Sequence, residues 1–310
     1  GSSGGAAAAL AARMLWLADG SDMMGSLRNP AAWNNVYGFR PTVGLVPGET
    51  RDAAVLHRLS TDGPMARDID DLEALLVTLS DGAHRPQEAA AAPTAPRIAW
   101  LADWGGAYRV EAGLLDRAEA ALKVMEGLGW RVEPLAPPYP ASAMWDAWTV
   151  LRQFALAMTL GPHWREEFEQ VQLPAQARWE VSHGFARKVA EVEWAAEARL
   201  AWLQAARKIF DSYDAVVLPA TQVWPFPVED RWPEVIAGVT MDSYHRWMEV
   251  MVPASLAGLP ALALPAGFGE TGLPAGVQLI GAPGSDAALL AMGRAYHAAT
   301  DWPGQRPPAL

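Results

Sequence analysis

Residues 19–47 read DGSDMMGSLRNPAAWNNVYGFRPTVGLVP, a stretch that is rich in turns and yet apolar. Four glycines, Gly20, Gly25, Gly38 and Gly44, interrupt it at irregular spacing. The pair Asn29-Pro30 suits the first turn of a short helix over residues 28–33. The glycine-flanked turn before Ser26 can aim several successive backbone N–H groups at one point, as anion-binding loops do. On spacing alone the stretch suits an ordinary tight turn, since Gly/Ser turns are common, and an anion-binding loop is the other interpretation.

A second loop rich in glycine and serine, GSSGG, occupies residues 1–5. An expression-tag remnant is one explanation, but the Ala- and Leu-rich run that follows predicts a helix over residues 6–17. A serine hydroxyl is a weak nucleophile that needs an adjacent base, and the oxyanion formed by its attack needs N–H donors. Ser2 and Ser3 in one loop and Ser26 in the other therefore suggest serine catalysis without histidine.

The composition narrows the class of protein. The chain has 310 residues, of which 51% are apolar and 19% charged, so we expect a folded domain with a large core. The net charge of −11 and the lack of a basic patch argue against nucleic-acid binding. The absence of cysteine excludes disulfides, thiolate catalysis and Cys-ligated metals. We find no apolar run of 18 residues and no signal peptide, so we expect no membrane association and a cytoplasmic location.

The order of the expected elements indicates an α/β fold. Short apolar strands alternate with amphipathic helices in the middle of the chain, and this βαβ rhythm favours parallel strands. We therefore expect a mixed, mostly parallel sheet sandwiched by helices, in a single domain over residues 1–310. Residues 83–96 are rich in Pro and Ala and predict a surface connector, and residues 161–182 are expected to be irregular. The expected strands span residues 97–101, 131–134, 215–218, 261–264 and 276–280, and the further helices span residues 111–127, 142–160, 184–211, 243–256 and 286–299, with one more after a turn within residues 60–81.

The two loops together resemble the amidase signature family, whose members are Ser–cis-Ser–Lys hydrolases. That family pairs a GGSSGG loop with G-[ST]-D-x-G-G-S-[IL]-R-x-P-A and a G-[LF]-[KR]-P-T stretch. Its loop serine and its nucleophile lie 24 residues apart, as Ser2 and Ser26 do here. The segments DAVVLP at 214–219, GLPALALPAGF at 258–268 and LPAGVQLIG at 273–281 extend the resemblance over nearly the whole chain.

The resemblance implies a role for each residue of the motif. Ser26 would be the acyl-forming nucleophile, and Ser2 the bridging serine that follows a cis Gly–Ser peptide. Asp22 and Arg28 would brace the loop, and Ser3 would support the network. The backbone N–H groups that would form the oxyanion hole are those of Met23, Met24, Gly25 and Ser26. The reaction would be amide hydrolysis through an acyl-serine, without a metal or organic cofactor.

The chain departs from the family pattern at two points. Met23-Met24 stands where the family has an x-Gly pair, so either the φ angle of Met24 is ordinary or strain is tolerated there. Met24 would also border the acyl pocket. The family's catalytic lysine lies upstream of the GSSGG loop, whereas this chain has only Lys123, Lys188 and Lys208, on expected helices among charged neighbours. We therefore expect the base in an N-terminal segment upstream of Gly1, and we expect residues 1–310 alone to be inactive.

The chain is rich in tryptophan, with 15 residues. Aromatic stripes at helical spacing usually pack in a core, but Trp145, Trp148 and Trp247 could instead line the acyl pocket with Met24. We therefore favour a hydrophobic or aromatic amide as the small-molecule substrate. The alternatives are the glutaminase component of a tRNA-dependent amidotransferase, or an inactive amidase-like remnant. The candidate partners are an upstream N-terminal segment or chain and a second copy of the chain.

Overall fold

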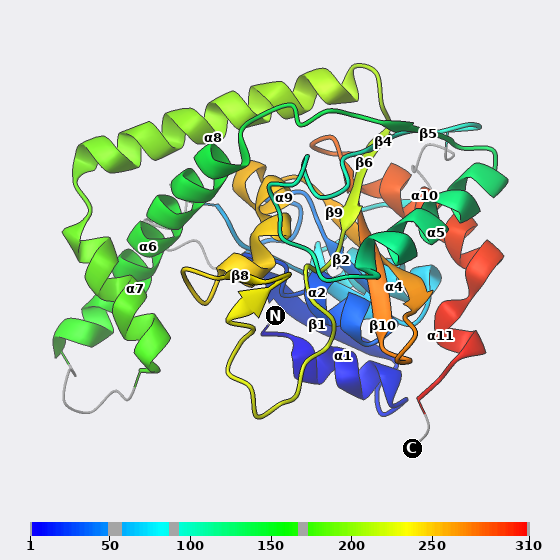
Figure 1. Cartoon of the computed structure of the whole chain (residues 1–310), viewed down its shortest axis with the longest axis horizontal. Helices are drawn as coiled ribbons and strands as arrows, with labels where there is room; N and C mark the ends of the chain where they lie inside the picture. The colour runs from blue at the N-terminus through cyan, green and yellow to red at the C-terminus, as the bar shows by residue number, and fades with distance from the viewer. Residues whose placement is uncertain (1, 49–57, 87–92, 167–172, 309–310) are drawn as a thin grey trace.

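A mixed β-sheet forms the centre of the protein, in a computed structural model that describes residues 2–48, 58–86, 93–166 and 173–308. Within these residues the sheet has eight strands in the order β1-β3-β2-β9-β10-β6-β4-β5, with helices on both faces (Figure 1). The expected class, α/β with a mixed sheet sandwiched by helices, is confirmed. The strands are β1 (Leu17–Asp22), β2 (Tyr37–Arg40), β3 (Thr61–Ala66), β4 (Arg97–Trp100), β5 (Arg131–Pro134), β6 (Ala215–Pro219), β9 (Ala261–Phe268) and β10 (Pro274–Gly281), with a separate hairpin of β7 (Val235–Ile236) and β8 (Val239–Thr240).

Parallel pairing is confined to one end of the sheet. Strand β4 pairs parallel with β5 and with β6, where the βαβ rhythm of the sequence predicted it. The other five neighbouring pairs within the large sheet are antiparallel, so the sheet is mixed, as expected, but not mostly parallel. Strands β9 and β10 are joined by the short turn of residues 269–273, and so tight a connection forces an antiparallel hairpin.

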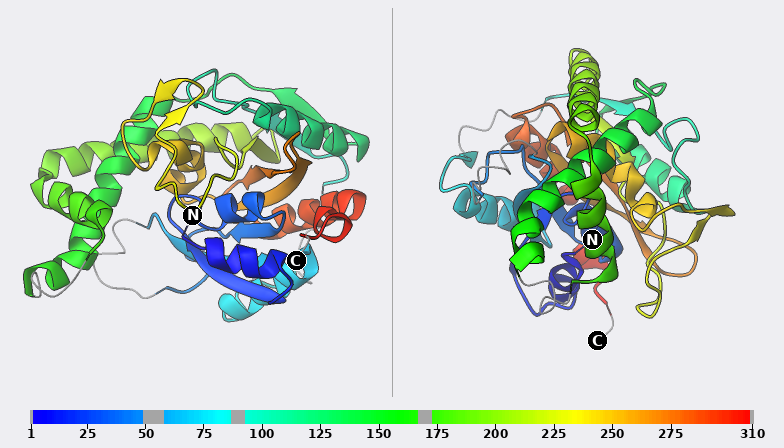
Figure 2. Two further views of the ribbon diagram at one scale, coloured as in Figure 1. Left: turned by 60° about the horizontal axis from the view of Figure 1, so that its bottom comes forward. Right: turned by 90° about the vertical axis from the view of Figure 1, so that its left-hand side faces the viewer.

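Helices cover the two faces of the sheet in separate groups (Figure 2). One face packs against α4 (Ile69–Leu79), α5 (Leu114–Gly127) and α10 (Asp286–Thr300). The strands alternate between the two faces, because Val217 of β6 contributes to this core and its neighbours Val216 and Leu218 contribute to the opposite one. The opposite core is formed with α2 (Arg28–Trp33), α6 (Ala141–Glu166), α8 (Val189–Phe210), α9 (Val252–Ala257) and the 3₁₀ helix η2 (Arg246–Met251).

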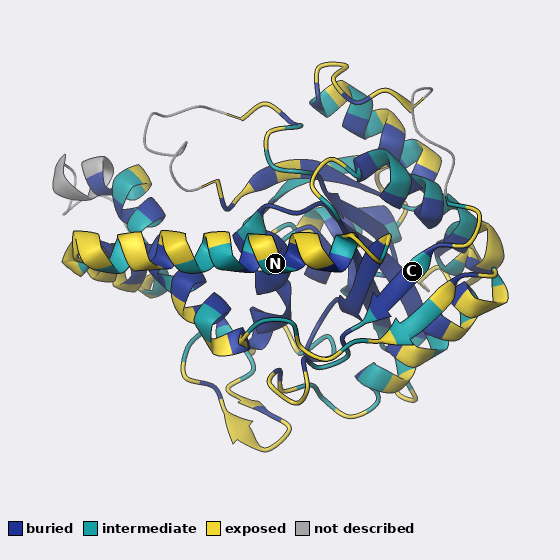
Figure 3. Ribbon diagram, turned by 90° about the horizontal axis from the view of Figure 1, so that it is seen from above, coloured by how far each residue is buried: buried dark blue, intermediate teal, exposed yellow. Residues whose placement is uncertain are grey.

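Helices α6, α7 (Ala175–Ala186) and α8 extend beyond the edge of the sheet as a helical arm (Figure 1). Figure 3 shows the contrast in burial, since the central strands are buried and the arm carries many exposed residues. The short helices α1 (Gly4–Ala11) and α11 (Trp302–Gln305) complete the described elements. Among the residues that the structure describes, no helix is both long and apolar enough to cross a membrane.

Long-range strand pairing shifts two boundaries near the N-terminus. The helix expected over residues 6–17 ends at Ala11, and Leu17 instead begins β1. Leu17 pairs with Ala66 in β3, a strand that lies where the sequence predicted a turn. Ladder hydrogen bonds between distant segments override the local helix propensity of this Ala- and Met-rich run. The helix expected over residues 28–33 and the strand over 131–134 are confirmed.

The middle of the chain is more helical than expected. Helix α6 continues to Glu166 and α7 begins at Ala175, so residues 161–182 are not irregular where they are described. The helix expected over 184–211 is split, because Arg187 and Lys188 are extended. The helix expected over 243–256 starts as η2 and becomes α9 near Pro253, which lacks an N–H group. The expected surface connector, 83–96, includes residues 87–92, which lie outside the described residues.

Candidate active site

The loop of residues 23–26 joins the end of β1 to the start of α2. Its shape requires glycine at position 25, where φ is +79°. A Cβ atom there would lie 2.4 Å from Met251 Cγ and 2.9 Å from the Asn29 amide nitrogen, closer than atoms pack. The carbonyl of Gly25 accepts a 2.7 Å hydrogen bond from the Asn29 N–H group. Strand β1, helix α2 and Met251 of η2 therefore fix the backbone that carries Ser26.

A buried ion pair braces this loop from behind. The Arg28 guanidinium donates to both oxygens of Asp22 at 2.9 Å, and neither side chain is exposed. Asp22 Oδ1 also accepts a 2.8 Å hydrogen bond from the Gly25 N–H group. Burial alone would raise the pKa of the Asp22 carboxyl, but the charges and hydrogen bonds of Arg28 and Arg40 hold that pKa well below its ordinary value. Asp22 is therefore ionised, and its charge fixes the loop.

Three further residues complete this network and were not predicted from the sequence. Arg40 Nη1 donates to the backbone carbonyl of Asp22 and lies 3.3 Å from its Oδ1. Arg28 donates to Gln278 Oε1 at 2.6 Å and to Ser255 Oγ at 2.8 Å. Arg40 and Gln278 were open to prediction, because each is a charged or polar residue inside a strand that is otherwise apolar and largely buried.

The two loops that carry the candidate catalytic serines meet in the structure. The N–H group of Ser2 donates to Ser26 Oγ at 3.1 Å; Ser2 is exposed and Ser26 is half-buried. The expected cis Gly–Ser peptide involves Gly1, which lies outside the described residues. Ser3 is the N-cap of α1, and its hydroxyl packs against Gly20 without a hydrogen bond to Ser2 or Ser26 in the described structure. The structure thus brings Ser2 to Ser26 and places Ser3 to one side.

The backbone amides of the loop differ in their availability to an oxyanion. The N–H group of Gly25 already donates to Asp22, so it supports the loop. The amides of Met23, Met24 and Ser26 have no acceptor among the described residues. Three of the four expected donors therefore remain free to stabilise a developing negative charge.

The three lysines of the chain lie on its surface. Lys123 is exposed on α5, Lys188 is exposed at the start of α8, and Lys208 is exposed in the last turn of α8. None of them lies on the loops that carry Ser2 and Ser26. A general base must lie within hydrogen-bond reach of the group whose proton it takes. This arrangement agrees with the expectation that the base is not one of these three residues.

The residues expected to line the acyl pocket are all buried. Met24, Trp145, Trp148 and Trp247 share one apolar cluster, and each is less than 8% exposed. The φ angle of Met24 is not positive. Methionine therefore replaces the family's glycine at this position without backbone strain, which was one of the two interpretations given above. Trp33 of α2 stacks on Trp247 with ring centroids 5.2 Å apart and an interplanar angle of 8°. Aromatic packing therefore continues from helix α2 into η2.

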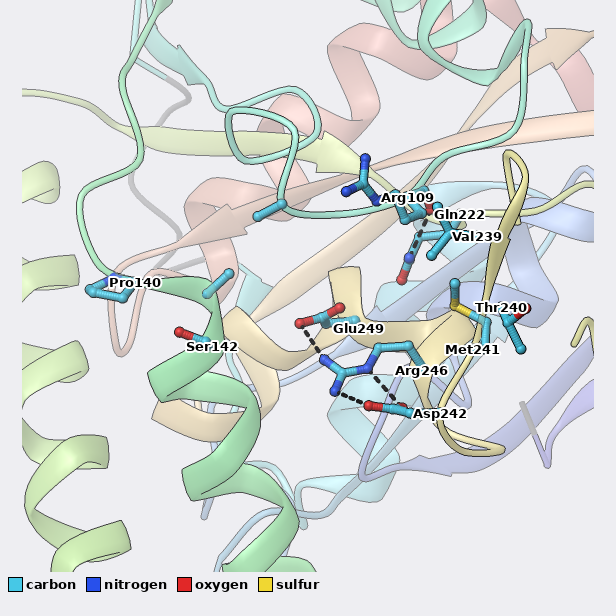
Figure 4. A pocket seen from close by; sticks show the side chains of 12 residues that line it. Arg109, Pro140, Ser142, Gln222, Val239, Thr240, Met241, Asp242, Arg246 and Glu249 are labelled. Carbon is cyan, nitrogen blue, oxygen red and sulfur yellow. Dashed lines mark hydrogen bonds and ion pairs between the residues drawn. The ribbon is translucent and has the colours of Figure 1, made fainter. Parts of the chain in front are cut away.

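A pocket of about 560 Å³ opens beside η2 (Figure 4). Arg246 lies between Asp242 and Glu249 and pairs with both, at 2.5 Å and 3.0 Å. Burial raises the pKa of the Glu249 carboxyl to about 7, although the charge of Arg246 opposes the shift. Arg109, on another wall, has no side-chain partner among the described residues. Sequence reasoning did not find this charged pocket, because its walls come from separate segments of the chain.

Comparisons with known proteins agree with this fold. The family model for Amidase matches residues 1–290. The A subunit of the glutamyl-tRNA(Gln) amidotransferase from Chloroflexus aurantiacus is 30% identical, over 99% of this chain and 68% of its own length. The crystal structure of a bacterial aryl acylamidase of the amidase signature family is 26% identical, with a TM-score of 0.86 over 99% of this chain and 68% of the other. The corresponding amidotransferase protein from Thermotoga maritima is 28% identical, with a TM-score of 0.69 over 95% of this chain and 65% of the other.

The fold and the paired serine loops define a serine-type hydrolase that acts on amides. The chain belongs to the amidase signature family, as the motifs around Ser2 and Ser26 predicted.

Proposed function

We propose that this protein hydrolyses carboxylic amides with hydrophobic or aromatic acyl or aryl groups, and that Ser26 is the nucleophile. The observation that carries the proposal is the hydrogen bond from the Ser2 N–H group to Ser26 Oγ, which joins the two loops at the expected 24-residue spacing. The unpaired amides of Met23, Met24 and Ser26 belong to the same loop as this hydroxyl. A reactive hydroxyl beside free N–H donors is the arrangement that acyl transfer requires.

The reaction begins when Ser26 Oγ attacks the amide carbonyl carbon and its proton leaves through the Ser2 hydroxyl to a base. The carbonyl oxygen becomes an oxyanion, which the free loop amides stabilise. The C–N bond then breaks as the leaving nitrogen takes up the proton, and ammonia or an amine departs. Water attacks the acyl-serine, which releases the carboxylic acid and returns the proton to Ser26.

The base in this proposal is a lysine that lies upstream of Gly1. The three lysines of residues 1–310 are exposed and do not lie on the serine loops, so they do not fit the role. The proposed N-terminal segment is therefore a partner in catalysis, whether it belongs to the same polypeptide or to another.

The substrate class follows from the apolar surroundings of the loop. Met24 and Trp247 are buried in one apolar cluster beside the loop of Ser26, and Trp33 stacks on Trp247, so a substrate group that enters here would meet thioether and aromatic side chains. Phe226 packs edge-on against both indole rings, at 5.3 Å and 5.7 Å. Such walls bind apolar groups and leave orientation to a few polar contacts. The likeness to an aryl acylamidase supports the same class.

A second candidate is a glutaminase that supplies ammonia within a larger complex. The curated relatives include components of glutamyl-tRNA(Gln) amidotransferases, and the pocket beside η2 carries the charged side chains of Arg109, Asp242 and Glu249. Opposite charges on the walls of one pocket suit an amino-acid substrate better than an aryl group. Release of ammonia from glutamine, measured beside hydrolysis of an aryl amide, distinguishes the two functions.

The nucleophile is tested by covalent labelling of the complete enzyme with a fluorophosphonate. We expect mass spectrometry to find the label on Ser26, and Ser26→Ala to abolish both labelling and turnover. Ser182→Ala is the matched control, because Ser182 is an exposed serine whose hydroxyl bonds only to the Arg178 carbonyl. A label on another serine would overturn the assignment.

A further inference from the structure

One face of α8 presents a regular stripe of exposed residues. They follow one another at spacings of three or four, so they lie on one side of the helix. Figure 3 shows α8 crossing the molecule with exposed positions turned outward along its length. The opposite side of the helix is buried through Ala195, Trp202, Ala206 and Ile209. The α8 stripe consists of Val189, Glu193, Ala196, Leu200, Gln204 and Arg207, all of which are exposed.

Leu200 lies at the centre of the α8 stripe, between two charged residues of opposite sign, and Val189 lies at its start. Leu200 is 53% exposed and Val189 is 75% exposed, which is high for apolar side chains of this size. Glu193 lies seven residues before Leu200, and Arg207 lies seven residues after it. Neither charge forms an ion pair within the described part of the chain. Seven residues are almost two helical turns, so both charges project on the same side as Leu200.

Because Glu193 and Arg207 lie at equal distances from Leu200, two copies of α8 can pair antiparallel with opposite charges facing each other. If a second α8 packs with its Leu200 on that of the first, Glu193 of each copy meets Arg207 of the other. A two-fold interface must be complementary to itself in this way. We propose that a second copy of this chain docks on the α8 stripe, with Leu200 on the two-fold axis and two Glu193–Arg207 ion pairs across the interface.

The position of α8 allows a second copy to approach. The helix runs along the outer edge of the molecule in Figure 1, and in the end-on view of Figure 2 it stands above the neighbouring elements. Its 22 residues give a contact line of about 33 Å. A single helix pair falls among small interfaces, below roughly 1,200 Å². We therefore expect reversible self-association, with a dissociation constant of the order of micromolar.

Charge reversal tests the pairing directly in the complete enzyme, which includes the proposed upstream segment. Analytical ultracentrifugation of the unmodified protein from about 1 to 100 μM should show a monomer–dimer equilibrium. In either single variant, Glu193→Arg or Arg207→Glu, residues 193 and 207 carry the same charge, and they face each other at two places in the dimer. Each single variant should therefore weaken dimerisation by about tenfold or more. The double variant Glu193→Arg/Arg207→Glu exchanges the two charges and should restore the dimer.

Two further variants make the result specific to the α8 stripe. Leu200→Glu places two carboxylates on the two-fold axis and should leave a monomer with an unchanged circular dichroism spectrum. Glu126→Arg makes the same charge reversal on an exposed position of α5 and should leave the dimer intact. An unmodified protein that stays monomeric at about 100 μM, or a dimer that is insensitive to both single reversals, would overturn the proposal. The former outcome would point to a different protein as the occupant of the stripe.

Discussion

Asp22 and Arg28 form a bidentate ion pair, with both N–O distances at 2.9 Å and both side chains inaccessible to solvent. The pair lies directly behind the loop of Ser26, and Arg28 continues from it to Gln278 and Ser255. Each nitrogen of the Arg28 guanidinium therefore donates to a buried acceptor. The loop that carries Ser26 is thus held by one buried charge pair and by residues from distant segments.

Removal of Arg28 should be strongly destabilising, because it leaves a carboxylate buried with fewer partners. We expect Arg28→Met to reduce the free energy of unfolding by about 3–5 kcal/mol. The control is Arg97→Met, which breaks a pair with Glu133 in which both side chains are more than 40% exposed, and which should cost at most about 1 kcal/mol. Urea denaturation at pH 7 measures both. Equal losses of unfolding free energy in the two variants would contradict the claim that the buried pair stabilises the fold more than the exposed one.

The Asp22–Arg28 pair makes the stability of the fold fall at acidic pH. The pKa of Asp22 is lowered in the folded protein, so its contribution to stability is complete above the unfolded pKa of about 3.9 and declines as pH falls below that value. Asp22→Asn should therefore lose stability at pH 7 and show a shallower decline than the unmodified protein below pH 4. Parallel acid denaturation curves would count against this assignment.

Gly25→Ala should distort the loop that carries the proposed nucleophile, Ser26. The φ angle of +79° costs an L-residue roughly 1–2 kcal/mol, and the new methyl group would also collide with Met251. We expect a loss of at least about 2 kcal/mol in stability, together with loss of turnover. Gly5→Ala is the control, because Gly5 lies in α1 with nothing within 4 Å, and this change should stabilise the protein by about 0.5–1 kcal/mol.

Met24→Gly tests the proposed acyl pocket. Truncation of a side chain that is 3% exposed opens space in the cluster that it shares with Trp247, so the enzyme should shift its preference towards bulkier acyl groups by about 1–3 kcal/mol in relative kcat/KM. Met125→Ala removes a comparably buried methionine on the other face of the sheet. It should lower stability without changing specificity. Unchanged relative kcat/KM across amides of increasing acyl size would place Met24 outside the pocket.

Local motifs were predictable from the sequence because neighbouring residues determine them. The helix of residues 28–33 and the proximity of Ser2 to Ser26 follow from turn chemistry, spacing and family resemblance. Strand β1 was missed because its identity depends on pairing with β3, a segment distant in the sequence. Ala- and Met-rich segments carry strong helix propensity, and only the partner strand decides against it.

The support of the site was predictable only in part. Arg28 lies 250 residues before Gln278 in the chain, and no local pattern reports such a contact. The motif placed Asp22 and Gly25 near the site. It did not predict the hydrogen bond from the Gly25 N–H group to the Asp22 carboxylate, because that bond depends on how the loop folds. Polar residues within buried strands were the available signal for Arg40 and Gln278. Trp145, Trp148 and Trp247 are buried in one cluster with Met24, as the core-packing interpretation predicted, and their place in an acyl pocket stays a prediction.

The last prediction concerns residues 1–310 expressed alone, which should lack amide turnover. In the proposed mechanism the Ser2 proton passes to a lysine upstream of Gly1, because Lys123, Lys188 and Lys208 are exposed and do not lie on the serine loops. This protein should also associate or aggregate. Strand β1 lies at an edge of the sheet, and the adjacent Met14 and Trp16 are 76% and 77% exposed.

An extended protein that includes a lysine-bearing upstream segment, in cis or as a second chain, should recover both solubility and activity. Apolar surface covered by that segment stabilises the fold by about 25 cal/mol per Å². Amide hydrolysis is assayed for the two proteins side by side, with the upstream lysine changed to Ala as the control. Robust turnover by residues 1–310, abolished when one of the three exposed lysines is replaced, would show that the base lies within this chain and would overturn the proposed mechanism.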